Sequence, residues 1–89
     1  MIERETEIVN RLGLHARAAA KLVHTAGSFQ SRVTVLKDGE EVDAKSILGI
    51  LLLAAGQGSQ IVVRCEGQDE ADALQAVTTL IANRFDEES

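Results

Sequence analysis

Cysteine and aromatic residues are scarce in this sequence. The single cysteine, Cys65, cannot form a disulfide within the chain, and one cysteine with two well-separated histidines cannot supply the four ligands of a structural zinc site. Phe29 and Phe85 are the only residues of the phenylalanine, tyrosine and tryptophan group, so the chain lacks the stacking platforms of a typical nucleic-acid binder. We therefore expect no metal, no other cofactor and no direct nucleic-acid ligand.

Long apolar runs and an excess of positive charge are also missing. No segment approaches the roughly 20 apolar residues that span a bilayer, and the N-terminus has no basic stretch followed by an apolar one. The net charge is −5, and from Glu66 onward seven acidic side chains stand against Arg84 alone. We expect a cytoplasmic protein without membrane insertion, and we expect its acidic tail from Asp86 to Ser89 to be frayed and solvated.

What is present is enough for one small hydrophobic core. The 89 residues are 45% hydrophobic and 26% charged, close to the average of globular domains. A chain of this length buries roughly 60 to 65% of the surface that its unfolded form exposes, which leaves no room for a second core. We expect residues 1–89 to form a single, monomeric domain.

The spacing of apolar residues predicts the element order βαββαβα. Alternation indicates strands, and a period of three to four residues indicates helices with one apolar face. The predicted strands cover residues 2–9, 33–37, 40–43 and 60–66, and the predicted helices cover 16–26, 47–53 and the residues after 69. Asp38-Gly39 is a hairpin signal, Ser46 and Asp69 are placed as helix N-caps, and Gly27 is placed as a left-handed C-terminal cap.

These elements imply an α+β fold. Amphipathic strands and helices give an open-faced two-layer sandwich, in which three helices cover one face of a mainly antiparallel four-stranded sheet and water meets the other. The same element order also fits unrelated small ferredoxin-like domains that bind amino acids, metals or RNA. The fold class alone therefore does not decide the function.

The segment Gly13-Leu14-His15-Ala16-Arg17 carries the clearest chemical signal. It places an imidazole at the start of a helix, where the first N–H groups lack partners and the helix dipole is positive, and both features suit a phosphate. The positive helix end also favours the neutral imidazole, whose nitrogen is the nucleophile that phosphoryl transfer needs. The guanidinium of Arg17 matches phosphate oxygens bidentately. We interpret His15 as a phosphorylation site.

A plainer interpretation is that His15 is only a polar loop residue before a helix. Histidine is not a preferred N-cap residue, however, and an arginine in the first turn opposes the helix dipole. His15 and Arg17 are thus both residue types that are unfavourable for helix stability at their positions. Two such residues within three positions favour a functional explanation for them.

Several further motifs accompany this segment at a fixed spacing. They are Lys21-Leu22-Val23, Ala44-Lys45-Ser46-Ile47, Leu51-Leu52-Leu53-Ala54-Ala55 and Glu66-Gly67-Gln68-Asp69-Glu70. With these motifs the chain, from about residue 2 to residue 85, resembles the histidine-containing phosphocarrier (HPr) family of the bacterial phosphoenolpyruvate-dependent phosphotransferase system. The resemblance implies the same βαββαβα sandwich and a stoichiometric phosphoryl carrier that is not an enzyme.

The resemblance also implies roles for individual residues. Nδ1 of His15 would accept a phosphoryl group from Enzyme I and pass it to a IIA-type domain. The Arg17 side chain and the backbone N–H groups of Ala16 and Arg17 would hold that phosphoryl group.

Two positions depart from the family pattern. Ala18 stands where the family usually has proline, and alanine there is expected to relax the active loop slightly without removing a phosphate ligand. Leu12 stands where sugar-transport members often have a small polar residue, and the segment Asn10-Arg11-Leu12-Gly13 is closer to the nitrogen-related branch of the family.

Ser46 carries a second signal of the resemblance. In many family members the matching serine is phosphorylated by a dedicated Ser kinase/phosphorylase, although capping of the next helix is an alternative reason for a serine here. A phosphate adds about −1.5 to −2 charges, which a helix N-terminus tolerates. We expect phosphorylated Ser46 to leave the helix intact and to slow transfer from Enzyme I.

The apolar run of residues 47–53 is too wide for one side of a sheet to bury. At 100° per residue Ile50 and Leu53 share one face, and three other large residues share another. An exposed apolar patch on a small protein usually marks an interface, although these residues would also serve to fill a loosely closed core. The residues that the resemblance assigns to partner docking are Ala20, Ile47, Leu48 and Leu51.

Two alternatives to a plain carrier stay open. One is a regulatory family member that signals through phosphorylated His15 or Ser46. The other, from a different class, is a ferredoxin-like regulatory domain that binds a small ligand such as an amino acid. Acid-labile labelling by phosphoenolpyruvate and Enzyme I, lost on His15→Ala, separates a carrier from such a ligand-binding domain.

Overall fold

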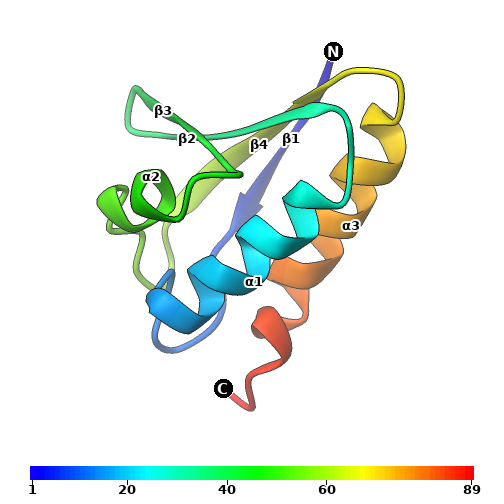
Figure 1. Ribbon diagram of the computed structural model, residues 1–89. Helices are drawn as coiled ribbons and strands as arrows, with labels where there is room; N and C mark the ends of the chain where they lie inside the picture. Colours follow the sequence, from blue (N-terminus) through cyan, green and yellow to red (C-terminus); the bar gives the residue numbers. More distant parts are fainter.

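The computed structural model describes residues 1–89 and contains four strands and three α-helices in the predicted order (Figure 1). Neighbouring strands are antiparallel throughout, and their order in the sheet is β1-β4-β2-β3. The strands are β1 (Ile2–Glu7), β2 (Arg32–Lys37), β3 (Glu40–Asp43) and β4 (Gln60–Glu66). The helices are α1 (Ala16–Gly27), α2 (Ile47–Leu52), α3 (Glu70–Ala82) and a short 3₁₀ turn, η1 (Arg84–Asp86).

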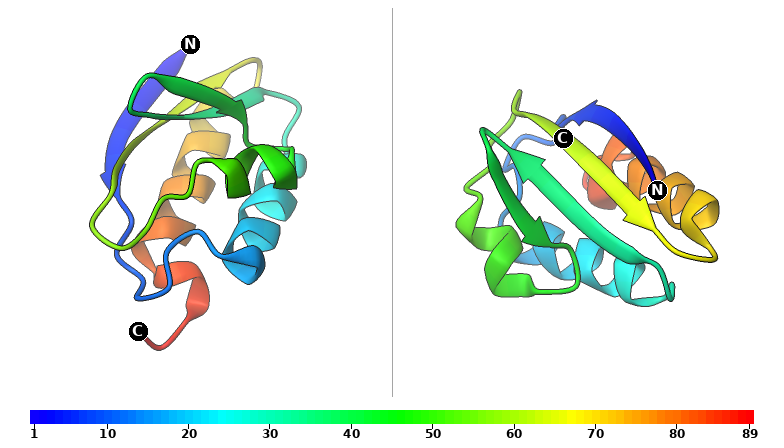
Figure 2. Two further views of the ribbon diagram at one scale, coloured as in Figure 1. Left: turned by 90° about the vertical axis from the view of Figure 1, so that its left-hand side faces the viewer. Right: turned by 90° about the horizontal axis from the view of Figure 1, so that it is seen from above.

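The helices all lie on one side of the sheet, as the amphipathic patterns predicted. Helices α1 and α3 run side by side, and α2 lies beside α1 and against β3 (Figure 2). The other face of the sheet carries no helix. The α+β open-faced sandwich is therefore confirmed. None of the helices combines the length and the apolar character needed to cross a membrane.

The core lies between the sheet and the helices. Alternate residues of β4, Ile61, Val63 and Cys65, are buried there, whereas the residues between them are partly exposed. Burial, together with the negative charges of Glu70 and Asp69, raises the pKa of the Cys65 thiol, so this cysteine is a small apolar core residue. Helices α1 and α3 contribute to the same core Ala18, Ala19, Leu22, Ala26, Ala73, Leu74, Val77 and Ile81.

Two predicted local signals have the expected geometry. Asp38 and Gly39 both have a left-handed backbone, with φ of 51° and 85°, as the two central residues of a type I′ hairpin require. The hydroxyl of Ser46 accepts a hydrogen bond from the Gly49 N–H group at 3.2 Å, so Ser46 caps α2.

Two predicted caps are wrong in detail. Gly27 is the last residue of α1 and not a left-handed cap, because the chain continues with a right-handed Ser28 whose N–H group donates to Thr25 O at 3.1 Å. Asp69 does precede α3, but its side chain caps no helix. Its carboxylate accepts hydrogen bonds from the N–H groups of Gln30 and Ser31, each at 2.9 Å, and from the Ser31 hydroxyl. Asp69 therefore joins the start of α3 to the loop before β2.

The acidic tail is solvated as predicted, with Asp86, Glu88 and Ser89 exposed, but the prediction that it is frayed is wrong. After α3 the chain turns through η1, in which Phe85 is completely buried. The carbonyl oxygen of Phe85 accepts a hydrogen bond from Lys21 Nζ at 2.7 Å, and that of Ser89 accepts one from the Arg11 N–H group at 3.0 Å. The tail is thereby held against the loop that leads into α1.

Candidate functional site

The loop that carries His15 is fixed by a close contact with the segment after α2. Gly13 has φ of +67°, and a Cβ atom there would stand 2.6 Å from Ala55 O and 2.7 Å from Gly56 Cα. The next residue, Leu14, donates its N–H group to the same Ala55 oxygen at 2.8 Å. Only glycine fits both the conformation and the space. The contact with Ala55 and Gly56 therefore fixes the conformation of the loop that precedes His15.

His15 is the N-cap residue of α1, as predicted, but its side chain caps nothing. Its backbone is extended, with φ of −74° and ψ of 177°, and its carbonyl oxygen accepts the first helical hydrogen bond, from Ala19 N at 2.8 Å. The N–H groups of Ala16, Arg17 and Ala18 donate to no protein acceptor outside the helix. The helix end thus combines unpaired N–H donors with positive partial charge beside a histidine whose side chain is 26% exposed.

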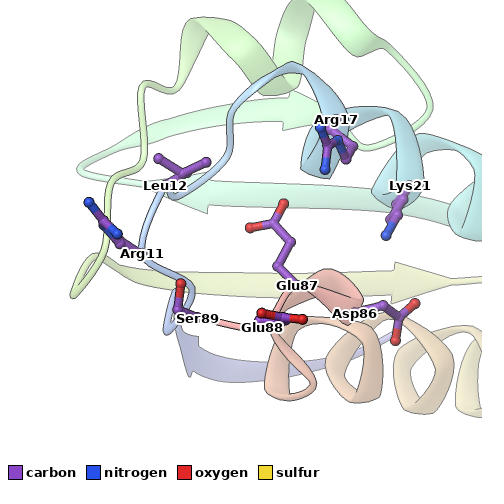
Figure 3. A pocket seen from close by; sticks show the side chains of 8 residues that line it. All are labelled: Arg11, Leu12, Arg17, Lys21, Asp86, Glu87, Glu88 and Ser89. Carbon is purple, nitrogen blue, oxygen red and sulfur yellow. The ribbon is translucent and has the colours of Figure 1, made fainter.

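Arg17 lies one residue further along and is free to bind an anion. Its guanidinium forms no ion pair and no hydrogen bond with the protein. Its side chain lines a groove of about 470 Å³, and Figure 3 shows it on α1 facing the C-terminal tail. The groove is lined by Arg11, Leu12, Arg17, Lys21, Asp86, Glu87, Glu88 and Ser89.

One site residue was missed by the sequence analysis. Figure 3 shows Glu87 pointing from the tail toward the start of α1. One of its carboxylate oxygens is hydrogen bonded to His15 Nε2, and the other accepts a hydrogen bond from Asn10 Nδ2 at 3.0 Å. The side chain of Glu87 is only 12% exposed. Nδ1 of His15 has no hydrogen-bond partner in the protein, so the two ring nitrogens stand in different surroundings.

The charge state of Glu87 suits this contact. Burial raises its pKa, but hydrogen bonds from Asn10 and His15 and the positive charges of Arg17 and, when its ring is protonated, of His15 outweigh burial and lower the pKa below its usual value. Glu87 is therefore an ionised hydrogen-bond acceptor at neutral pH.

The predicted exposed apolar face of α2 is present. Ile50 and Leu53 are buried, whereas Leu48 is 64% exposed and Ile47 is 45% exposed. Leu51 is 36% exposed, and Ala20 lies exposed on the neighbouring α1. These residues therefore do not fill the core. Two other exposed leucines, Leu12 at 65% and Leu52 at 67%, were not among the predicted docking residues.

Ser46 lies directly before α2 and shares no hydrogen bond with the histidine site. It is partly buried, and its hydrogen bonds run to Asp43, Gly49 and Ile50. None of them reaches the segment around His15.

Comparisons with known proteins agree with this geometry. A family model described as the PTS HPr component phosphorylation site matches residues 2–83. A phosphocarrier protein HPr from Xylella fastidiosa (strain Temecula1) is 54% identical over 89 residues, which is 100% of both chains. The solved structure of HPr-C-His from Thermoanaerobacter tengcongensis has a TM-score of 0.97 and 46% identity over 100% of both chains. An HPr dimer from the same organism has a TM-score of 0.79 and 46% identity, covering 98% of this chain and 100% of that one.

Proposed function

The chain belongs to the HPr family and is therefore a phosphocarrier protein of the phosphotransferase system, not an enzyme, and on that premise we propose that Nδ1 of His15 carries the phosphoryl group. The observation that carries this proposal is the position of His15 as an N-cap without a capping side chain. The N–H groups of Ala16 and Arg17, which directly follow His15 at the start of α1, are unpaired. With Nε2 engaged by Glu87, the nitrogen left for the phosphorus atom is Nδ1.

Arg17 and the helix end supply the charge that a phosphoryl group requires. The helix N–H groups and dipole favour an anion, and a guanidinium without an internal partner binds phosphate oxygens at no loss of another ion pair. We assign Arg17 to stabilisation of the phosphoryl group during both transfers, because the same groups serve when it arrives and when it leaves.

The partners of such a carrier are proteins of the phosphotransferase system such as Enzyme I and IIA domains. For this chain we propose that they dock on Ala20, Ile47, Leu48 and Leu51, next to His15. A contiguous apolar surface on a small protein usually marks an interface, and α2 packs beside α1, so one partner can cover both helices. Leu12, in the loop before α1, and Leu52, the last residue of α2, are further exposed apolar side chains.

We further propose that Ser46 is a regulatory phosphorylation site, served by a Ser kinase/phosphorylase. Its hydroxyl caps α2 and lies at the border of the proposed docking surface. A phosphate there would place negative charge where partners bind and would leave the helix N-terminus stable. This regulation would act on docking and not on the chemistry of His15.

Leu12 bears on which branch of the family the chain serves. The phosphoryl group could pass to a sugar-specific or to a nitrogen-related IIA domain. We propose the nitrogen-related domain as the alternative to the sugar-specific one, because Leu12 places an apolar side chain in the groove beside Arg17. The relative rates of transfer from the phosphorylated protein to a sugar-specific and to a nitrogen-related IIA domain would identify the branch.

We also propose that residues 1–89 act in the cytoplasm as one monomeric carrier domain. A concentration series in gel filtration would distinguish this monomer from a dimer.

Substitution of the two histidines tests the proposed phosphorylation site. Incubation with phosphoenolpyruvate and catalytic Enzyme I is expected to give the parent one acid-labile phosphoryl group. His15→Ala is expected to abolish the label, and His24→Ala, which changes the only other histidine, is expected to keep it. Labelling of His15→Ala would refute the proposal.

A further inference from the structure

The chemistry proposed for His15 uses Nδ1 and leaves the contact at the other ring nitrogen unexplained. Nε2 is hydrogen bonded to Oε2 of Glu87. Oε1 of Glu87 accepts from Asn10 Nδ2 at 3.0 Å, and the same amide nitrogen donates to Gly13 O at 2.8 Å. Asn10 is completely buried. A buried side chain therefore ties Glu87 to the loop that positions His15.

The backbone of the tail is shaped to bring Glu87 to this place. Arg84, Phe85 and Asp86 have φ of 58°, 53° and 62°, and such left-handed conformations are unfavourable for residues other than glycine. They reverse the chain after α3, so that Glu87 points back at the start of α1 (Figure 3). An unfavourable conformation that the surrounding structure maintains is often found at functional sites.

Anchors on both sides keep the tail in this position. Before Glu87, Phe85 is buried in the core and its carbonyl oxygen binds Lys21 Nζ at 2.7 Å. After Glu87, the Ser89 carbonyl oxygen accepts from Arg11 N at 3.0 Å. The carboxylate is therefore presented to His15 by a supported segment.

We propose that Glu87 is a positioning residue for phosphoryl transfer, which keeps the proton of His15 on Nε2 and turns the lone pair of Nδ1 toward the phosphoryl donor. This inference rests on the proposed function of His15. A carboxylate accepts only from an N–H group, so the nitrogen that faces Glu87 is protonated, and in the neutral ring, which has a single proton, Nδ1 therefore carries the lone pair. Carboxylates orient catalytic histidines in other proteins by the same contact.

The contact also serves the transfer step itself. As the bond between phosphorus and Nδ1 forms, the bond between phosphorus and the donor breaks, and its electron pair stays with the donor. The Nε2 proton does not move, so the phosphorylated ring is a cation. The negative charge of Glu87 compensates that cation, and no proton acceptor is needed. In onward transfer the same electron pair returns to Nδ1 and the ring becomes neutral again.

Three variants test this role. Glu87→Ala removes the acceptor, and Glu87→Gln keeps an acceptor oxygen without the charge. Glu88→Ala is the matched control, because Glu88 is the adjacent acidic residue, is exposed and forms no hydrogen bond with the site. The first readout is the pair of ring ¹⁵N chemical shifts of His15 in the unphosphorylated protein at about pH 9, where an ordinary histidine is neutral. The second is the rate of phosphorylation by Enzyme I.

We expect the parent and Glu88→Ala to show one protonated nitrogen, Nε2, and one unprotonated nitrogen, Nδ1. In Glu87→Ala the two shifts are expected to move toward each other as both tautomers become populated, and the rate is expected to fall about tenfold. Glu87→Gln is expected to keep the parental shifts with an intermediate rate.

Parental shifts and a parental rate in Glu87→Ala would overturn the proposal, as would an equal loss in Glu88→Ala. The ¹⁵N measurement needs no phosphate. If no variant, including the parent, accepts a phosphoryl group, the proposed function of His15 fails whatever the shifts show. If the parent is labelled and Glu87→Ala is unchanged in both readouts, the positioning role alone fails.

Discussion

Gly13 and Ala55 approach so closely that no side chain fits between them. The Cβ of an alanine at position 13 would stand 2.6 Å from the Ala55 carbonyl oxygen, which already accepts the Leu14 N–H group. This contact joins the loop that carries His15 to the segment that follows the docking helix α2. The chemical site and the proposed docking surface are therefore held in one fixed relationship.

Gly13→Ala is the first prediction that follows from this contact. The left-handed conformation and the clash with backbone atoms together are expected to lower the free energy of unfolding by about 2 to 5 kcal/mol. Gly39→Ala is the control, because Gly39 also has a positive φ but has open space around it, and its loss is expected to be only about 1 to 2 kcal/mol. Urea denaturation measures both, and equal losses would contradict the close contact.

The contact between Asp69 and the loop before β2 predicts a dependence of stability on pH. Hydrogen bonds from the Ser31 hydroxyl and the Gln30 N–H group lower the pKa of Asp69 below its usual value. Because the pKa is lower in the folded than in the unfolded protein, the stabilisation is complete above the ordinary carboxyl pKa of about 4. It is lost as the pH falls through the lowered folded-state value.

Asp69→Asn is therefore expected to lower stability at pH 7 and to reduce its decline below about pH 4. Asp72→Asn, in the same first turn of α3 but without these hydrogen bonds, is the control. Urea titrations between pH 7 and pH 3 make the comparison. An acid decline as steep in Asp69→Asn as in the parent would contradict the account.

Two substitutions of Ser46 distinguish its role as a helix cap from its proposed role as a regulatory phosphorylation site. Ser46→Ala removes the hydrogen bond to Gly49 and is expected to lower the free energy of unfolding by about 1 kcal/mol. Ser46→Asp keeps a good N-cap residue and adds negative charge, so it is expected to retain stability and to be phosphorylated more slowly by Enzyme I. If Enzyme I phosphorylates Ser46→Asp as fast as the parent, the regulatory role is excluded.

The exposed face of α2 predicts a defect in docking without a defect in folding. Leu48→Asp is expected to change the free energy of unfolding by no more than about 0.5 kcal/mol, because Leu48 is exposed. It is expected to raise the KM of Enzyme I for this protein about tenfold, which corresponds to roughly 1.4 kcal/mol of binding. Ala71→Asp makes the same charge change at an exposed position of α3 and is expected to leave the KM unaltered. Equal KM values for the two variants would contradict docking on α2.

Most of the fold followed from local sequence signals. The hairpin at Asp38-Gly39, the cap at Ser46 and the alternation of β4 each depend on a few adjacent residues, and the structure confirms all three. The position of His15 at the start of α1 was equally predictable, because the alanine-rich helix begins directly after it.

The long-range contacts were not predictable in this way. Glu87 reaches Asn10 across 77 positions of the chain, and the turn that brings it there uses three non-glycine residues in a left-handed conformation. No sequence motif marks that turn. Phe85, a large apolar residue directly before the acidic tail, is the one sequence signal that could have shown that the chain returns to the body of the protein after α3, where Phe85 is completely buried. Asp69 was misjudged for the same reason, since its partners Gln30 and Ser31 lie far away in sequence.

The atom that bears the phosphoryl group is the most direct test of the central claim. The protein, phosphorylated with phosphoenolpyruvate and Enzyme I, would be examined by ³¹P and ¹⁵N NMR, which identify the modified nitrogen. We predict a single phosphoryl group on Nδ1 of His15, with the proton retained on Nε2 next to Glu87. A phosphoryl group on Nε2, on His24 or on any residue other than His15 would contradict the account.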